Sequence, residues 1–274
     1  QFLITIKGRN MNKFNKLLCA ATISAMSTVA NANPIYMDLT ELDANNGGLL
    51  SGMLMTDLFD NFITTSFNPT STYVDTNGTA GIQTGDYVFD EATDIALSSL
   101  QPLGVVAAAG YGFTWQLNVD WTLEGVTVVV PDAADPLVDN YVGFFNSGLI
   151  TFDFEDLVNP GNSQEDIMTL SVTSTAGTMP TDSHLALTVF AELTGVKDNT
   201  FFTQDGTDFD DILNDGDPAT FLNFTGSSNL SQLDNAPAAT GGVMNINGTD
   251  YDVYERTTTL GSVDIRTVSE PSTL

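Results

Sequence analysis

Four oxygen-bearing side chains in this sequence have the spacing of ligands in a twelve-residue calcium loop. Asp75, Asn77, Thr79 and Asp86 occupy positions 1, 3, 5 and 12 of residues 75–86. Ile82 supplies an apolar residue at position 8. Because Ca²⁺ binds carboxylate, amide and other hard oxygen ligands, this spacing predicts a calcium site.

The same loop departs in two places from the EF-hand and dockerin-type loops that it resembles. Ala80 stands where those loops have glycine, and Asp86 replaces the longer, bidentate Glu. The flanking residues lack a helical pattern. A plain Asn77-Gly78 hairpin turn explains the same residues without a metal, so both interpretations stay open.

A second candidate site is the densest run of carboxylates, at residues 205–217. Many like charges in a short span repel one another unless a cation lies between them, so calcium is a candidate here too. The spacing matches no particular metal loop, and a solvated acidic loop is the alternative. The candidate ligands are Asp205, Asp208, Asp210, Asp215 and Asp217.

The sequence does not predict catalysis. Paired carboxylates suit a glycosidase, but among 35 acidic residues some pair reaches the required separation by chance. The single histidine, His184, lies in a strand-like run, which favours a surface position over a general base. Motifs for serine hydrolases, zinc proteases and phosphate loops do not occur. We therefore expect no enzyme activity.

The charge balance restricts the partners of the protein. Residues 33–274 contain all 35 acidic residues but only Lys197, Arg256 and Arg266 as basic ones, a formal net charge of −32. Phosphate contacts need Lys and Arg, so nucleic acid is not an expected partner. Self-repulsion opposes compaction unless cations screen it, which favours calcium as a counter-ion. The alternative is that the charge only keeps the protein soluble.

Residues 11–32 have the layout of a secretory signal peptide. Lys13 and Lys16 form a basic start, and residues 17–29 form an apolar stretch shorter than the ~20 residues that span a bilayer. Ala30-Asn31-Ala32 is a small-x-small cleavage site. The segment predicts a secreted protein, located outside the cell or at its surface.

Two further features concern the N-terminal part of the chain. Residues 1–10 precede the first methionine, Met11, and fit no targeting logic, so we expect a non-native leader. The only cysteine, Cys19, lies in the segment that export would remove. An exported protein without cysteine has no disulfides, so its stability must come from a packed core.

The elements that must position these side chains are strands. Residues 113–124 alternate apolar and polar types, with Phe113, Trp115, Leu117 and Trp121 on one face. This pattern predicts a long strand with one buried face. The two tryptophans are therefore expected in the core and not on a sugar-stacking platform.

Similar alternation continues along the chain and predicts an all-β fold, an antiparallel β-sandwich or jelly-roll-like domain over residues 33–266. A division near residues 198–218 is the alternative. Asn247-Gly248 between two strand-like runs predicts a hairpin, and residues 57–63 have the one weak helical pattern. The other strand-like runs are 149–155, 168–173, 185–189, 243–246, 251–254 and 263–267, separated by turn-rich segments at 131–139, 159–163, 177–182 and 235–242.

The C-terminal residues 267–274 contain Glu270, Pro271 and Ser272, followed by Thr273-Leu274. This end resembles the start of the PEP-CTERM sorting signal of exosortase-processed bacterial proteins, with Ser269 in place of the first proline. The resemblance implies exosortase-type sorting machinery as a partner. It also implies a membrane helix and a basic tail beyond Leu274, through which the protein would be transiently anchored.

Members of that family are exported by bacteria that make exopolysaccharide, biofilm or flocs. The resemblance and the export signal together predict a structural or adhesion protein of the cell surface or extracellular matrix, stabilised by cations. Extracellular polysaccharide or matrix is the expected partner. A carbohydrate-binding module is the alternative, and a glycoside hydrolase is a third, less favoured one.

Overall fold

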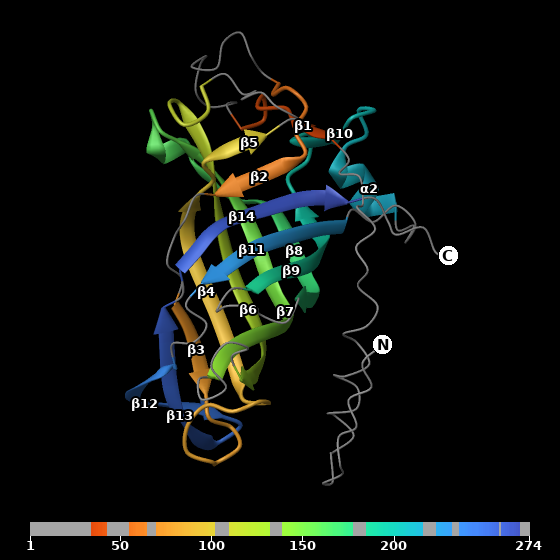
Figure 1. Cartoon of the computed structure of the whole chain (residues 1–274). Coiled ribbons are helices and arrows are strands. Elements are labelled where there is room, and N and C mark those ends of the chain that lie inside the picture. The colour runs from red at the N-terminus through yellow and green to blue at the C-terminus, as the bar shows by residue number, and fades with distance from the viewer. Residues whose placement is uncertain are drawn as a thin grey trace, which may run out of the picture.

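The computed structural model describes residues 34–42, 55–64, 70–101, 110–131, 139–177, 185–215, 223–231, 236–257 and 259–268. Most of these residues lie in strands (Figure 1). The strands are β1 (Ile35–Met37), β2 (Asn61–Thr64), β3 (Thr70–Val74), β4 (Tyr87–Ala96), β5 (Ser99–Gln101), β6 (Trp115–Pro131), β7 (Asp139–Asp156), β8 (Gln164–Gly177), β9 (Leu185–Val196), β10 (Phe201–Thr203), β11 (Asn223–Ser231), β12 (Ala238–Ile246), β13 (Thr249–Thr257) and β14 (Thr259–Val268). The short helices are η1 (Pro160–Asn162) and α2 (Phe209–Asp215).

One antiparallel sheet contains most of the strands, in the order β12-β13-β3-β4-β6-β7-β8-β9-β11-β14-β2-β5. The chain passes directly from β4, which pairs with β6, to β5, which pairs with β2. Leu97 N donates to Leu117 O at 2.9 Å, and the next residue, Ser98, donates to Ile63 O at 2.7 Å. The sheet therefore curls back on itself, so that β2, β11 and β14 cross in front of β4, β6 and β7 (Figure 1).

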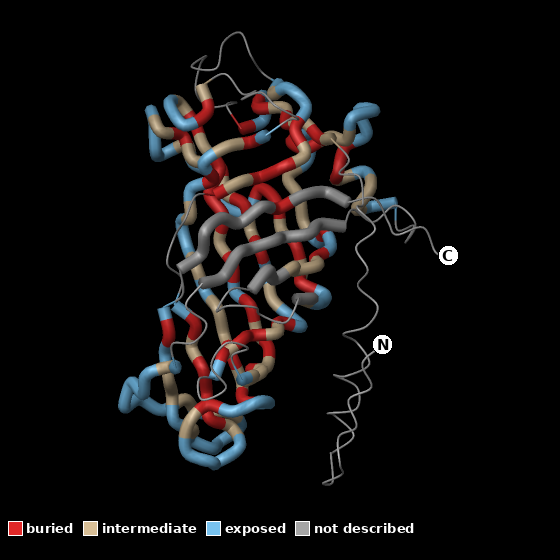
Figure 2. The backbone as a smooth tube through the Cα atoms, viewed as in Figure 1, coloured by how far each residue is buried: buried red, intermediate tan, exposed pale blue. Residues whose placement is uncertain are grey.

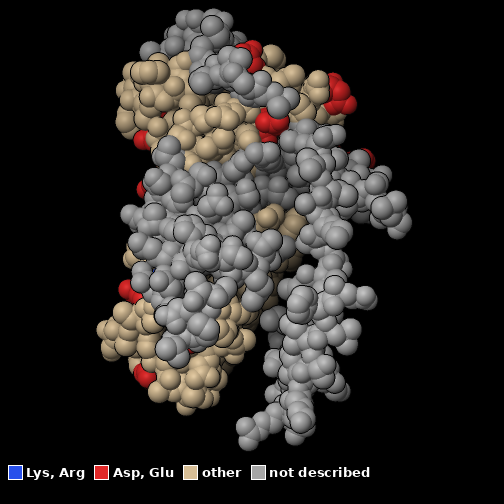
Figure 3. All heavy atoms as spheres, in the orientation of Figure 1, with Lys and Arg blue, Asp and Glu red and all other residues tan. Residues whose placement is uncertain are grey.

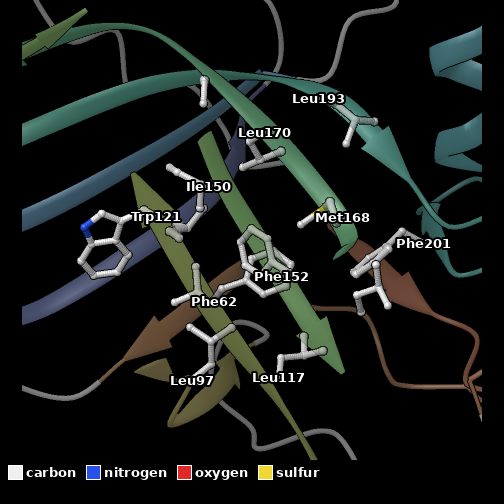
Figure 4. Packing of buried hydrophobic residues seen from close by; sticks show 14 of the residues in the cluster. Phe62, Leu97, Leu117, Trp121, Ile150, Phe152, Met168, Leu170, Leu193 and Phe201 are labelled. Atoms are coloured by element: carbon white, nitrogen blue, oxygen red, sulfur yellow. The ribbon is translucent and has the colours of Figure 1, made fainter. Parts of the chain in front are cut away.

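The core lies between these two layers. Phe62 of β2 and Phe152 of β7 meet across it with ring centroids 4.9 Å apart, and both side chains are fully buried (Figure 4). Ile265 of β14 adds to the same cluster. Figure 2 shows buried residues along much of the length of the molecule, this middle region included. The antiparallel all-β sandwich predicted from the sequence is confirmed.

The alternation along β6 and β7 is reproduced in the burial of their side chains. Trp115, Leu117 and Trp121 are buried on β6, and Ile150 and Phe152 are buried on β7. The prediction that both tryptophans belong to the core is confirmed.

The same prediction was wrong for Phe113, which is 86% exposed. The strand begins only at Trp115, and the preceding turn is held by hydrogen bonds from Phe113 N and Thr114 N to Gly110 O. Below the turn, Tyr111 packs edge-on against Trp115 and donates from its hydroxyl to Leu97 O. The two-residue period therefore does not extend to Phe113.

The predicted Asn-Gly hairpin is confirmed between β12 and β13. Asn247 and Gly248 both have positive φ, 53° and 86°, as a type I′ turn requires. The turn-rich segment 235–242 differs from its prediction, because β12 already begins at Ala238. Residues 240–242, Thr-Gly-Gly, interrupt the strand pattern in the sequence, and they form a β-bulge between Ala239 and Val243.

The weak helical pattern at residues 57–63 was wrong, because Asn61 to Thr64 form strand β2. Phe59 and Phe62 are both buried in the core. A single turn of helix is costly to nucleate. As a strand between β14 and β5, these residues instead form backbone hydrogen bonds with both neighbours and place their apolar side chains in the core.

A two-stranded sheet of β1 and β10, with α2 beside it, lies at one end of the molecule (Figure 1). Phe201 and Phe209 of this part are fully buried and belong to the same hydrophobic cluster as Phe152. Tyr36 and Phe202 stack on its outer side at 5.1 Å. The domain boundaries at residues 33 and 266 stay predictions.

Candidate functional site

The loop between β3 and β4 contains the first predicted calcium ligands. Asp86 is fully buried and receives five hydrogen bonds from the loop itself. Its Oδ1 accepts from the backbone and side chain of Thr76 at 3.0 and 3.2 Å and from those of Asn77 at 3.2 and 2.9 Å. Its Oδ2 accepts from Gln83 N at 2.8 Å. The Asp86 carboxylate therefore connects the start of the loop, at Thr76 and Asn77, with Gln83 near its end.

The other predicted ligands of this loop have different surroundings. Asp75 is buried, and its Oδ1 accepts from Gly78 N at 3.2 Å. Asn77 Oδ1 accepts from the N–H of Thr79, whose side chain is exposed. Asn77 and Asp86 are therefore in contact, whereas Asp75 contacts the loop at Gly78 and the Thr79 side chain is exposed. The Asp86 carboxylate accepts hydrogen bonds from donors that point inward, which is the reverse of a calcium loop, where inward oxygen acceptors bind a cation.

The second acidic segment is less closed. Asp208 is buried, and its Oδ2 accepts from Asn199 N at 2.8 Å. Its Oδ1 accepts from Asp210 N at 3.0 Å, which is the contact of an N-cap residue at the start of α2. Asp205 lies outside in the turn before the helix and accepts hydrogen bonds from the hydroxyls of Thr203 and Thr207. These hydrogen bonds, that of Thr203 first, lower the pKa of Asp205.

The remaining carboxylates of this segment do not join Asp208. Asp210 accepts from Asn214 Nδ2 at 2.9 Å on the helix surface, and Asp215 is exposed at the helix end. Asp217 lies outside the described residues. Across the described ranges, no three acidic, histidine or cysteine side chains are grouped to hold a metal ion. Calcium binding at either place stays a prediction.

A third group of carboxylates, which the sequence did not reveal, lies on the outer face of the central strands. Asp120 of β6 accepts from the N–H of Asp94 at 2.6 Å, and Asp153 of β7 accepts from that of Asp166 at 2.6 Å. Both donors sit at β-bulges, with φ of 55° and 54°. Burial raises the pKa of Asp153, and the charges of Asp120, Asp166 and Glu165 raise it further.

This group was missed because its four aspartates are far apart in the sequence. Only the alternation of β6 and β7 placed Asp120 and Asp153 on a common outer face. The bulges that bring Asp94 and Asp166 to them insert one extra residue in β4 and two in β8.

A polar cluster lies where β13, β3 and β4 meet. Asp90 accepts from Ser71 Oγ at 2.6 Å and from Trp121 Nε1 at 2.8 Å. Arg256 is 6% exposed, and its guanidinium carbon lies 5.4 Å from the centroid of the Tyr73 ring. Burial raises the pKa of Asp90 and raises that of Tyr73 to about 12. These contacts connect β13 with β3, β3 with β4, and β4 with β6.

A shallow hollow of about 590 Å³ lies beside this cluster. Its wall is formed by the first residues of β12 and by Glu255 and Arg256 of β13. Among the described residues of its lining, Glu255 is the one carboxylate, so these residues do not provide the carboxylate pair of a glycosidase.

Several predicted features fall outside the described residues. These are His184, the leader and signal peptide at residues 1–32, and the sorting motif of Glu270, Pro271 and Ser272. Within the part of the chain that is described, no helix is long and apolar enough to cross a membrane.

Comparison with known proteins adds no relative to these observations. No protein-family model, no curated protein sequence and no solved structure matches the chain.

Proposed function

We propose that this chain is a secreted structural or adhesion protein of the bacterial cell surface or extracellular matrix, associated with exopolysaccharide and stabilised by divalent cations. Exosortase-type machinery would sort it through the C-terminal motif. The observation that carries the proposal is the spread of carboxylates over a compact β fold with very few basic residues. On the face seen in Figure 3, acidic side chains are scattered, and no Lys or Arg is visible among the described residues.

The physical basis is that dispersed carboxylates act together as a polyanionic surface. Divalent cations can bridge a protein carboxylate and a carboxylate of an acidic polysaccharide, because hard cations accept oxygen ligands from both. The pair of Asp120 and Asp153 is suited to such bridging, because the two lie close together on the outer face of β6 and β7; burial first, and then the charge of Asp120, raises the pKa of Asp153.

The test measures retention of the purified protein on beads that carry a covalently coupled polyuronate. We expect retention in millimolar calcium and release in sodium at equal ionic strength, because screening alone does not bridge two anions. Uncoupled beads are the control. The double variant Asp120→Asn, Asp153→Asn should bind more weakly. Equal retention in both salts, or none in calcium, would contradict the proposal.

Cation stabilisation has a separate measurement. Calcium should raise the melting temperature more than sodium does at matched ionic strength, because an ion bound only by the folded state stabilises it by mass action. The gain is ~2.7 kcal/mol at a hundredfold excess over the dissociation constant. Equal shifts in the two salts would show that calcium is not bound specifically. The acidic residues would then serve only solubility and general screening.

A carbohydrate-binding module is the second candidate, favoured by one observation. Tyr87 and Phe89 are half-buried neighbours on the same face of β4, with ring centroids 4.5 Å apart. Tyr87 donates to Glu124 Oε2 at 2.7 Å, and burial first, then Glu124, raises the pKa of Tyr87 to about 12. Rings beside a carboxylate can stack on a sugar and bind its hydroxyls. Binding to neutral polysaccharide that Tyr87→Ala weakens and EDTA does not would favour this function.

A further inference from the structure

Two exposed turns of the molecule have the same tripeptide, Asn-Gly-Thr. Residues 77–79 lie in the loop between β3 and β4, and residues 247–249 lie at the turn between β12 and β13. Both match the acceptor motif for N-linked glycans, in which Asn is followed by any residue except proline and then by Ser or Thr. Both turns lie at the lower end of the view, and Asp75 N donates to Asp252 O of β13 at 3.0 Å (Figure 1). One motif can therefore be compared in two environments.

The surroundings of Asn77 occupy both ends of its side-chain amide. Its Nδ2 donates to the buried carboxylate of Asp86 at 2.9 Å, and its Oδ1 accepts from Thr79 N at 2.8 Å. The backbone N–H of Asn77 donates to the same carboxylate at 3.2 Å. A reaction at Nδ2 would compete with a charge-assisted hydrogen bond inside the loop, so this amide is a poor acceptor for a sugar in the folded protein.

Asn247 has the opposite surroundings. It is exposed, and its side chain forms no hydrogen bond with any described residue. Its neighbours hold the turn instead, since Gly248 N donates to Asn245 Oδ1 at 3.0 Å and Asn245 Nδ2 donates to Asp250 Oδ1 at 2.6 Å. Around Gly248 no described atom lies within 4 Å of the point where a side chain would begin, and Thr249 is exposed. A bulky group on the Asn247 amide would therefore displace no packed residue.

The sequence contains two further matches to the motif, at Asn223 and Asn229, and both fall within β11. The backbone of this strand pairs with β9 along one edge and with β14 along the other. N-linked glycans belong to surface loops, whereas a strand with a neighbour on each edge presents no turn to an enzyme. Among the four matches, the one at residues 247–249 combines a surface turn with a free amide.

We propose that Asn247 is an N-glycosylation site, modified in preference to Asn77 with an oligosaccharide from a lipid pyrophosphate donor. In this step Nδ2 of Asn247 attacks C1 of the first sugar. The N–C1 bond forms, the bond between C1 and the phosphate oxygen breaks, and the lipid pyrophosphate leaves. The amide gives one proton to a base of the transferase. Because the motif is an acceptor in secreted proteins, the inference rests on the export that is part of the proposed function.

The experiment is peptide mass spectrometry of the chain isolated from the surface and the medium of the bacterium that produces it. We expect the peptide that contains Asn247 to be heavier by one or more sugar residues, with sugar ions among its fragments. The peptide that contains Asn77 should have its unmodified mass. Thr249→Ala removes the hydroxyl that the motif requires but keeps both residues of the turn, so the sugar should be lost. Thr249→Ser is the matched control and should keep it.

Melting curves check that both variants are folded, and the map of the unaltered sequence decides the inference independently of them. An exported chain without sugar on Asn247 overturns the inference and leaves the proposed function intact. Modification of Asn77 to the same extent overturns the preference that the hydrogen bonds predict. A sugar that stays on Asn247 in Thr249→Ala also overturns it, because the motif would not be what the enzyme recognises. A chain found unmodified inside the cell by fractionation would contradict both the inference and the proposed function.

Discussion

The two acidic segments differ both in their density of carboxylates and in their structure. In the loop of residues 75–86, one fully buried carboxylate, that of Asp86, accepts five hydrogen bonds, and the buried Asp75 accepts one from Gly78 N. In residues 203–215, Asp208 accepts two backbone hydrogen bonds, and the carboxylates of Asp205 and Asp215 stay outside. The denser run of acids has thus produced the looser arrangement.

The difference shows that the environment of a carboxylate matters more than the number of carboxylates nearby. Inward N–H groups of a tight loop need an acceptor, and an unpaired buried donor costs about 1–3 kcal/mol. A buried Asp meets that need without a metal. In the second segment Asp208 accepts from only two N–H groups, that of Asp210 in the first turn of α2 and that of Asn199.

The largest expected effect tests the first loop. Asp86→Ala removes a buried carboxylate that accepts five hydrogen bonds from Thr76, Asn77 and Gln83. We expect the free energy of unfolding to fall by about 3 kcal/mol or more, because hydrogen bonds to a charged group are the strong ones. Urea denaturation in EDTA measures it. Asp215→Ala, at the exposed end of α2, is the control and should change stability by less than about 0.5 kcal/mol.

The result also bears on calcium in this loop. If Asp86 serves the protein alone, the loss in Asp86→Ala is the same in calcium and in EDTA. If a calcium ion binds there, the calcium-dependent rise in melting temperature should disappear in the Asp75→Ala, Asp86→Ala double variant. A wild-type stability for Asp86→Ala in EDTA would show that the loop is not held by this carboxylate.

An intermediate effect is expected in the second segment. Asp208→Ala removes the N-cap of α2 and the acceptor of Asn199 N, which should lower the free energy of unfolding by about 1–2 kcal/mol. Asp208→Asn keeps a capping oxygen and should recover most of the loss. A loss as large as that of Asp86→Ala would contradict the distinction between the two segments. The calcium response of Asp208→Ala, Asp210→Ala tests this segment as an ion site.

The smallest effect concerns Asp205 and depends on pH. Its pKa is lower in the folded protein, because the hydroxyls of Thr203 and Thr207 donate to the ionised form. Its contribution to stability is therefore present above the ordinary Asp pKa of about 3.9 and is lost as the pH falls through the lower folded value. Asp205→Asn should melt slightly below the wild type at neutral pH and together with it in strong acid. A difference that grows toward acid would reverse the sign and contradict the assignment.

The parts of the fold that were predicted correctly depend on local pattern. The alternation in β6 and β7 placed Trp115 and Phe152 in the core, and Asn247-Gly248 set the hairpin turn, because side-chain period and φ preference are properties of short segments. The failures occur where pairing overrides local preference. The segment around Phe62 became a strand, and the turn before Trp115 exposed Phe113.

For the candidate sites, the sequence by itself determined the acidity, the scarcity of basic side chains and the short-range closeness of Asp75, Asn77 and Asp86. It could not determine that Asp86 would be buried among donors, since that depends on how the loop packs beside β6. Only the tertiary structure joined Asp120 to Asp153, because strands that are neighbours in space bring together residues far apart in the chain. It also left β12 at the end of the sheet, because strand order is fixed by packing of the whole core and not by any one segment.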